Sequence, residues 1–417
     1  MTAIGLSATE KTNRALLALL LILYPLGALP FILYEVYRGR KYAFLLLSLW
    51  MGLFTVLFPP VSDSYRHYLD YLACRTQTWN NVLQDSGMDM GLACLNMMCA
   101  KTGISFEMER FLITVASLQM IFRIFNDICR TNRVLDNNRY RLAFLLLLCL
   151  NYRYFTLIIG LRWLFAATIF TTGAYLLFAK DRKLGLLFAA AAIFMHFAIT
   201  GFAVGAALLY LTRFRLSKTL TTALFLAGWT VSALVFDRLL ALFVGEQEVS
   251  HHLNAYINGN YGQDVFDGFM NQNAFIYIYL TYLPLIPLSA YAFAVPWRNR
   301  HTLAGIAALG MLMLGVTVKF PIIQERFVNV ETMLLLFLCM QTFSPDRFRR
   351  LCLKTALGLS ALSFAATIYA HRRFLAASRL HQFIYKPAPL ILANTYDEKW
   401  LQQNLDSEGL PMFQYRL

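Results

Sequence analysis

The chain has 417 residues, of which 58% are hydrophobic and only 14% are charged, whereas an average globular domain is about 25% charged. This composition excludes a disordered chain, a secreted disulfide scaffold and an ordinary soluble enzyme. The 37 basic and 23 acidic residues give a net charge of +14, which in a soluble protein would suggest nucleic-acid binding. In a membrane protein the same excess belongs in short cytoplasmic loops, so the positions of the charges decide between the two interpretations.

Apolar segments long enough to cross a bilayer follow one another along almost the whole chain. A spanning helix needs about 20 apolar residues, because every backbone amide in hydrocarbon must be satisfied within the segment. The sequence therefore predicts an all-α, polytopic membrane protein that forms one domain over residues 1–417, without an internal repeat. The predicted spans lie near residues 15–35, 42–58, 107–128, 140–159, 161–179, 184–211, 219–244, 273–295, 302–320, 327–343 and 355–370.

The basic residues predict the orientation of these spans. Many of them fall in six short loops, which we assign to the cytoplasm because positive charge is retained on that side. These residues are Arg38, Arg40, Lys41, Arg130, Arg133, Arg139, Arg141, Lys180, Arg182, Lys183, Arg213, Arg215, Lys218, Arg298, Arg300, Arg347, Arg349, Arg350 and Lys354. The outer side then carries the longer segments 59–105 and 245–272 and the tail 371–417. Topology accounts for most of the positive charge, and we expect no binding of nucleic acid.

The segment 184–211 has basic residues at both ends, so both ends should be cytoplasmic. Its 28 residues are too few to cross a hydrocarbon core of about 30 Å twice, because each half would reach only about 21 Å. We therefore expect a broken or re-entrant helical hairpin with His196 near its turn. The total is about 12 transmembrane helices, or 10 plus this hairpin.

The cysteines carry little functional information. Cys129, Cys149, Cys339 and Cys352 lie in or beside predicted spans, where cysteine acts as a small buried apolar residue. Cys74, Cys94 and Cys99 lie in the outer segment 59–105, where a disulfide can form. No spacing typical of a zinc site is present, and we expect no metal.

A dense group of polar and aromatic residues opens the first outer segment. Its members are Asp63, Tyr65, Arg66, His67, Tyr68, Asp70 and Tyr71. On a helix, Asp63, His67 and Tyr71 share one face, and Arg66 and Asp70 can form an i,i+4 pair. Such a group suits a sugar, which needs hydrogen-bonding partners and flat surfaces for stacking. The alternative interpretation is an interfacial aromatic belt with a solvated ion pair.

Three further places hold ionisable residues in apolar surroundings. Arg153 and Arg162 lie at the predicted outer ends of adjacent spans, and a guanidinium offers forked donors that match phosphate. His196 lies at the predicted hairpin turn, and Glu325 and Arg326 lie in a short outer connection. We expect Arg326 to join Arg162 over one cavity. The alternatives are arginines that reach to lipid phosphates, a core histidine and a rim ion pair.

The order of these features resembles the EpsG-like branch of the Wzy-type bacterial polysaccharide polymerases. The residues that carry the resemblance are Arg38, Arg40, Asp63, Tyr65, Tyr68, Tyr71, Leu161, Arg162, Ala166, His196, Arg326, Tyr385, Lys386 and Pro387. The resemblance implies a fold like that of the GT-C membrane glycosyltransferases. It also implies an enzyme of the bacterial inner membrane that joins undecaprenyl-pyrophosphate-linked repeat units on the periplasmic side. A flippase and a chain-length regulator of the same pathway are then expected as partners, besides membrane lipid.

The implied chemistry is displacement at an anomeric carbon with a lipid pyrophosphate as leaving group. Arg162 and Arg326 are then expected to bind the pyrophosphate, and His196 or Asp63 to act as base or to orient the acceptor. The expected contacts to sugar or phosphate come from Arg66, Arg153, Tyr65, Tyr68 and Glu325. No cofactor or metal is expected, since arginines supply the positive charge.

Four other functions compete with this hypothesis. An O-antigen ligase uses the same donor, but usually carries its Arg and His together in one large outer loop. A metal-dependent polyprenyl-phosphate sugar transferase often has paired acids in its first outer loop, which Asp63-Ser64-Tyr65 does not provide. A lipid-oligosaccharide flippase is expected to show internal halves. A scaffold subunit without chemistry remains a further alternative.

Overall fold

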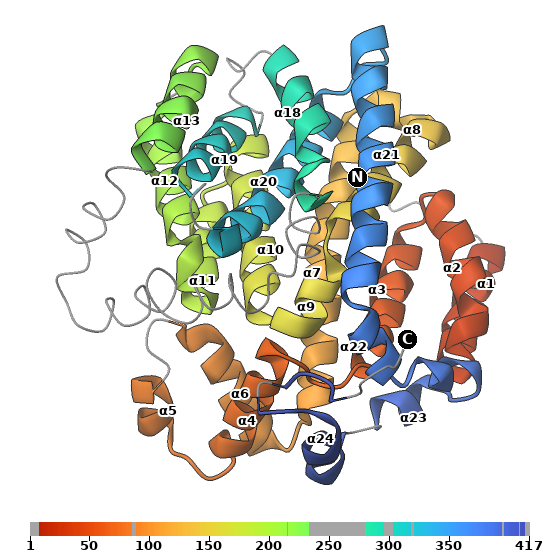
Figure 1. The fold of residues 1–417 in the computed structure, drawn as a ribbon. Coiled ribbons are helices and arrows are strands. Elements are labelled where there is room, and N and C mark those ends of the chain that lie inside the picture. Colours follow the sequence, from red (N-terminus) through yellow and green to blue (C-terminus); the bar gives the residue numbers. More distant parts are fainter. Residues whose placement is uncertain are drawn as a thin grey trace.

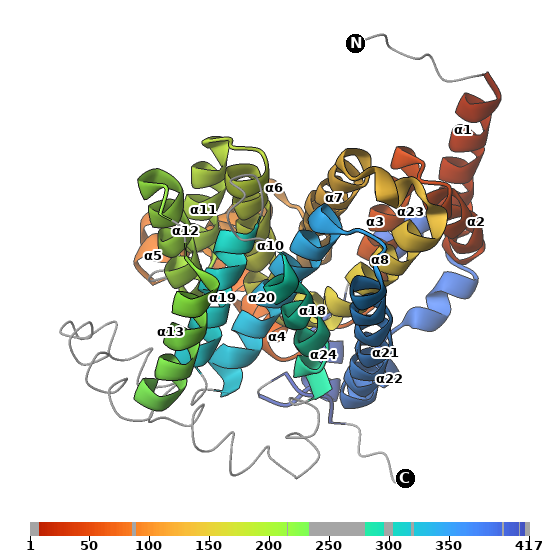
Figure 2. The same ribbon diagram turned by 90° about the horizontal axis from the view of Figure 1, so that it is seen from above.

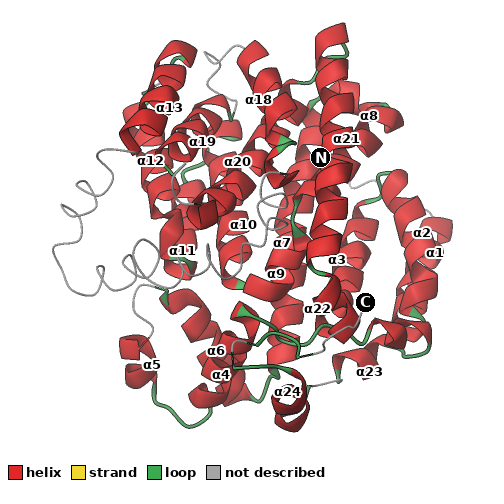
Figure 3. Cartoon of the chain, viewed as in Figure 1, coloured by secondary structure: helices red, strands yellow, loops and turns green. Residues whose placement is uncertain are grey.

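In the computed structural model the described residues are 8–85, 89–214, 216–232, 280–295, 303–317, 321–393, 396–407 and 409–412. Over these ranges the regular structure is helical, apart from one isolated bridge between Leu405 and Pro411 (Figure 3). The all-α prediction is confirmed. The predicted outer loop 245–272 lies outside the described residues.

The helices follow one another with short connections. In the first half they are α1 (Ala8–Leu23), α2 (Pro25–Tyr37), α3 (Lys41–Val56), α4 (Asp63–Cys74), α5 (Trp79–Asp85), α6 (Met90–Thr102), α7 (Phe106–Thr131), η1 (Arg133–Asp136), α8 (Asn138–Asn151), α9 (Tyr154–Gly160), α10 (Arg162–Ala174), η2 (Tyr175–Ala179) and α11 (Leu184–Met195). In the second half they are η3 (Phe197–Ile199), α12 (Thr200–Thr212), α13 (Lys218–Ser232), α18 (Leu285–Ala294), α19 (Ala304–Val316), α20 (Pro321–Thr342), α21 (Arg347–Ala370), α22 (Arg372–Ala377), η4 (Leu380–Ile384), α23 (Ala388–Leu392) and α24 (Glu398–Asn404).

The long helices form a bundle, and short helices cover one of its ends. In Figure 1 the helices α4, α5, α6 and α24 lie together at the bottom, below α7, α9 and α10. We call this end the α4–α6 face. The view from above in Figure 2 places α7, α10 and α20 near the middle, with α12 and α13 on one side and α2 and α3 on the other.

Four helical segments are long and apolar enough to cross a membrane: Phe106–Thr131, Asn138–Gly160, Arg162–Ala179 and Arg347–Ala370. Shorter apolar helices accompany them, at Lys41–Val56, Leu184–Met195, Phe197–Thr212, Leu280–Ala294 and Ala304–Val316. These segments make the chain a membrane-embedded protein. The total of about 12 spans and the likeness to GT-C enzymes stay predictions.

The first predicted span, 15–35, differs from the structure because it is divided. Helix α1 ends at Leu23 and α2 begins at Pro25, with Tyr24 between them outside the helical region. Proline lacks an N–H group and disfavours a helical conformation at the residue before it. Two helices therefore replace one.

The segment 184–211 forms a helical hairpin that breaks at His196, as the sequence predicts. His196 has an extended backbone (φ −157°, ψ 115°) and ends α11, and α12 begins at Thr200. The 12 residues of α11 span about 18 Å, which is shorter than a hydrocarbon core. Gly173 and Gly185 let α10 and α11 approach closely, since a side chain on either would overlap the other helix.

Helix α9 is a short, fixed element that separates Arg153 from Arg162. The residues that bound it, Arg153 (φ 50°) and Leu161 (φ 35°), both have positive φ, which is uncommon outside glycine. The Tyr154 hydroxyl donates to the carbonyl of Met51 and lies 2.5 Å from the hydroxyl of Thr55. These contacts attach α9 to α3.

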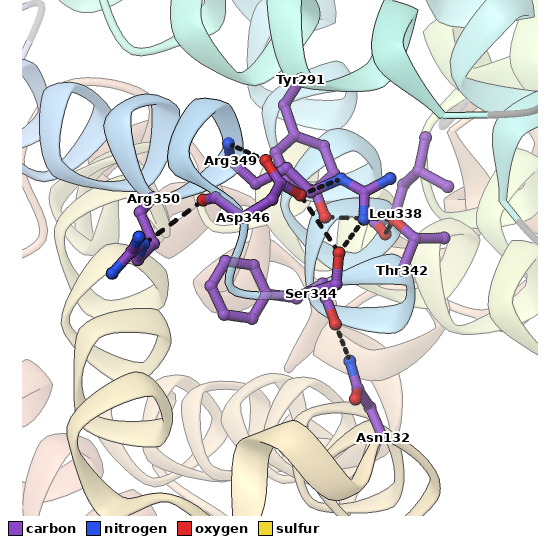
Figure 4. A network of polar contacts seen from close by, with 9 residues as sticks. Asn132, Tyr291, Leu338, Thr342, Ser344, Asp346, Arg349 and Arg350 are labelled. Atoms are coloured by element: carbon purple, nitrogen blue, oxygen red, sulfur yellow. Dashed lines mark hydrogen bonds and ion pairs between the residues drawn. The ribbon is translucent and has the colours of Figure 1, made fainter.

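A polar network joins the helices at the end of the bundle opposite the α4–α6 face (Figure 4). Asn132 donates to the carbonyls of Met340 (2.9 Å) and Phe343 (3.1 Å), which ties the end of α7 to the end of α20. Asp346 caps α21 by accepting from the backbone N–H of Arg349 at 2.9 Å. The network fixes the turn between α20 and α21.

All seven cysteines are free, so no disulfide joins Cys74, Cys94 and Cys99. Cys129, Cys339 and Cys352 are buried as predicted, but Cys149 is exposed on α8. Because α8 belongs to a candidate span, this thiol faces the lipid rather than the core.

Candidate functional site

A carboxylate that the sequence analysis did not single out joins two of the predicted site residues. Asp89 immediately precedes α6, and its Oδ2 lies 2.9 Å from a guanidinium nitrogen of Arg162. Its Oδ1 lies 3.3 Å from Nδ1 of His196 and accepts from the N–H of Phe197 at 2.8 Å. One side chain thus connects α6, the start of α10 and the break between α11 and α12.

A glycine allows Asp89 to reach this position. A Cβ atom on Gly91 would lie 2.8 Å from the Cα of Met195, so only glycine lets the first turn of α6 lie against the end of α11. The carboxylate therefore points at the residues that follow α11. Its side chain is only 13% exposed, and that of His196 is 2% exposed.

Aromatic and cationic groups complete the surroundings of His196. The ring of Trp163 meets the imidazole edge-on, with 5.5 Å between the ring centres. The guanidinium of Arg326 lies 5.9 Å from the centre of the Trp163 ring, within the range of a cation–π contact. We call Asp89, Arg162, Trp163, His196 and Arg326 the Asp89 cluster.

The Asp89 carboxylate is held in its ionised form. Burial alone would raise the pKa of Asp89, but His196, the charge of Arg162 and the N–H of Phe197 outweigh it and lower the pKa to about 2. With His196 neutral, two arginines and one carboxylate leave a net positive charge. This charge favours an anion such as phosphate.

The geometry also gives the histidine a direction. Nδ1 of His196 faces Asp89, so the neutral ring that carries its proton on this nitrogen has a free lone pair on Nε2. Such a ring can accept a proton from a hydroxyl. The buried His67 of α4 lies near enough to Arg162 to sense its charge, and burial is the main cause of the lowered pKa of His67.

Arg153 belongs to a separate group. One of its guanidinium nitrogens lies 3.0 Å from Oε1 of Glu325, and the other donates to the carbonyl of Thr281 at 3.1 Å. His371, which follows α21, stacks on Phe155 with 5.3 Å between ring centres and lies close enough to feel the charge of Glu325. The neighbours Glu325 and Arg326 thus contact different groups.

The predicted sugar-binding residues on α4 are dispersed. Arg66 pairs with Asp63 rather than with Asp70, whose carboxylate lies 3.6 Å from Nδ1 of His67. Tyr68 is buried against Phe106, and burial raises the pKa of Tyr68 to about 12. Tyr65 lies beside Gly409 of the tail. Asp63 and Arg66 are the more exposed members of this set.

Asp89 carries no motif that would have revealed it. It lies in the predicted outer segment 59–105, where a single acidic residue is ordinary, and its partner His196 is 107 positions away. A useful signal was available in reverse, because two ionisable residues in apolar sequence, Arg162 and His196, each require a partner. Among the described residues no three His, Cys, Asp or Glu side chains are grouped as a metal ion would need.

These features define an all-helical membrane protein with a buried, net positive cluster below its α4–α6 face. The EpsG family model matches residues 41–378, which cover most of the chain and include the whole Asp89 cluster. The chain therefore belongs to the EpsG family, a family of Wzy-like polysaccharide polymerases, and the resemblance seen in the sequence is confirmed. Comparisons with curated proteins and with solved structures find no match.

Proposed function

We propose that this protein joins lipid-linked repeat units into a surface polysaccharide. In this reaction the growing glycan leaves its undecaprenyl pyrophosphate and is transferred to a hydroxyl of a single repeat unit on a second carrier. The observation that carries the proposal is the Asp89 cluster, in which Asp89 holds both Arg162 and His196 while Arg326 stacks near Trp163. The cluster lies in a chain of a polymerase family.

The residues divide the chemistry between them. The acceptor oxygen attacks the anomeric carbon, the bond from this carbon to the pyrophosphate oxygen breaks, and its electron pair leaves with the pyrophosphate. Arg162 and Arg326 stabilise the negative charge that develops there, a type of contact worth about 10²–10³ in rate per donor. His196 accepts the proton of the acceptor hydroxyl at Nε2. Under this proposal the reaction needs no metal, because the arginines supply the positive charge.

The other predicted residues take supporting roles in this proposal. Asp63 and Arg66, on the exposed side of α4, orient the acceptor glycan, with Tyr65 and Tyr68 beneath them. Arg153 and Glu325 hold α9 and α20 together beside the substrate. We further propose that the α4–α6 face is the periplasmic side of the bacterial inner membrane. There a flippase would deliver the repeats and a chain-length regulator would limit the product.

The test is a polymerisation reaction with purified protein in detergent. Incubation with a lipid-linked repeat unit is expected to give a ladder of products on a gel. Transfer only to lipopolysaccharide core would identify a ligase, and lipid translocation in liposomes without product would identify a flippase. Either outcome would overturn the proposal.

The variant Arg162→Ala sharpens this test. It is expected to abolish polymer and leave single repeats on the lipid carrier, because the leaving group loses its nearest buried cation. The matched control is Arg123→Ala, which removes an exposed arginine from α7 away from the cluster. Polymer of normal length from Arg162→Ala would remove Arg162 from the mechanism.

A further inference from the structure

A cavity of about 450 Å³ lies on the other side of α9 from the Asp89 cluster. Side chains from α2, α3, α7, α8, α9 and α21 line it, among them Trp50, Phe122, Cys149 and Ile368. Two tyrosine hydroxyls of the lining are engaged elsewhere, since Tyr152 pairs with Thr168 and Tyr154 with Thr55. The lining is therefore apolar, and its volume lies within the usual range of about 300–1,000 Å³ for ligand sites.

The cavity opens toward the lipid. Cys149 on α8 and Ile368 on α21 both line it and are both exposed, and both helices belong to candidate spans. Leu33 of α2, at 49% exposure, lies on the opposite side of the opening. A lipid chain can therefore enter from the side without crossing the protein.

Positive charge lies at the α4–α6 end of this cavity. Leu375 of α22 lines it, and α22 begins with Arg372 and Arg373, both exposed. The guanidinium of Arg372 lies 4.1 Å from the centre of the Tyr369 ring, which keeps the charge beside the end of α21. A ligand with an apolar chain and an anionic head matches this combination of lining and charge.

Helix α9 separates the cavity from the Asp89 cluster. Tyr154 and Phe155 in its first turn line the cavity, whereas Arg162, just beyond its end, belongs to the cluster. The same division occurs on α20, where Glu325 contacts Arg153 and the next residue, Arg326, lies over Trp163. The two places are thus neighbours without being one site.

We propose that this cavity binds the polyprenyl chain of the second lipid-linked substrate, the acceptor, with its pyrophosphate at Arg372 and Arg373. The inference rests on the proposed function, because a polymerase holds two lipid carriers at once. The donor's leaving group occupies the Asp89 cluster, so the acceptor's carrier needs an apolar slot and a cationic rim of its own. The cavity supplies both, and α9 keeps the two pyrophosphates apart.

The experiment uses photo-crosslinking in phosphatidylcholine proteoliposomes that contain the full chain. The probe is undecaprenyl pyrophosphate without sugar, carrying a diazirine on its chain. Crosslinks are expected on α8 and α21 near Cys149 and Ile368, and excess unlabelled undecaprenyl pyrophosphate should reduce them at least tenfold. Competition by phosphatidylglycerol, or equal labelling of all lipid-facing helices, would identify an ordinary lipid contact and overturn the proposal.

Two sets of variants separate the chain from the headgroup. Cys149→Trp fills the cavity and should remove its labelling, while Leu146→Trp, on the exposed side of the same helix outside the cavity, should not. Ile368→Trp repeats the test from α21 if Cys149→Trp fails to fold. Reversing Arg372 and Arg373 to Glu should weaken labelling by the pyrophosphate probe but not by the corresponding uncharged polyprenol. Equal labelling of both by this variant would refute the headgroup assignment.

The polymerisation reaction distinguishes the two ways of failing. Specific labelling of the cavity by a protein that forms no polymer would refute the proposed function and leave a polyprenyl site. Polymer formation without specific labelling would refute the cavity proposal alone.

Discussion

Replacing Asp89 by asparagine removes one negative charge from the centre of the cluster while keeping the size of the side chain. The amide oxygen can still accept from the N–H of Phe197, but the ion pair with Arg162 is lost and Nδ1 of His196 no longer faces a carboxylate. Arg162 and His196 would then lose the group that fixes their positions. We expect the Asp89→Asn variant to fold and to polymerise poorly.

The size of the effect on stability follows from the pKa of Asp89. It falls from 3.8 to about 2, and since a tenfold change in acidity is worth about 1.4 kcal/mol, the cluster stabilises the carboxylate by about 2 kcal/mol. Because the pKa is lowered on folding, this contribution is complete above about pH 4 and is lost as the pH falls through about 2. The difference between wild type and variant should therefore be constant from pH 5 to 8.

The loss of activity should exceed the loss of stability. Misplacing one donor to a developing negative charge costs about 10²–10³ in rate, and here a cation and a base lose their common partner. The assay is the initial rate of polymer formation from a lipid-linked repeat, with thermal unfolding in detergent measured in parallel. Asp181→Asn is the matched control, because Asp181 forms an exposed pair with Arg213 away from the cluster. A rate within threefold of wild type for Asp89→Asn would refute the role of Asp89.

Two further predictions concern packing. A methyl group on Gly310 would overlap the buried carboxylate of Glu331, so Gly310→Ala should destabilise the protein by about 1–3 kcal/mol, and the added change Glu331→Ala should restore much of the thermal stability; an unchanged melting temperature in Gly310→Ala would contradict this packing. The Tyr396 hydroxyl donates to the carbonyl of Leu57 at 2.7 Å, and Tyr396→Phe should cost about 1 kcal/mol and speed proteolysis of the tail. Equal proteolysis rates would show that this bond does not hold the tail.

The membrane character and the hairpin could be predicted because they depend on local composition. Apolar runs give the spans, and basic residues at both ends of 184–211 require a chain that returns, so the break falls at His196. The division of the first span at Tyr24 was also readable in principle, because Pro25 marks it.

The partners of the polar residues could not be predicted in the same way. Arg66 has carboxylates three positions before it and four positions after it on one helix, and both spacings allow a pair, so sequence alone does not choose Asp63 over Asp70. Asp89 reaches Arg162 and His196 only through the close approach of α6 to α11 at Gly91. Such contacts are set by tertiary packing rather than by spacing.

The bounds of α9 have a consequence for the length of the catalytic region. Its seven residues, held between two residues of positive φ, act as a spacer of about 10 Å between Arg153 and Arg162. One added residue would turn everything beyond it by about 100° and move Arg162 away from Asp89. The reach between two carriers is therefore encoded as a whole number of residues in a single helix, and it can change only in steps.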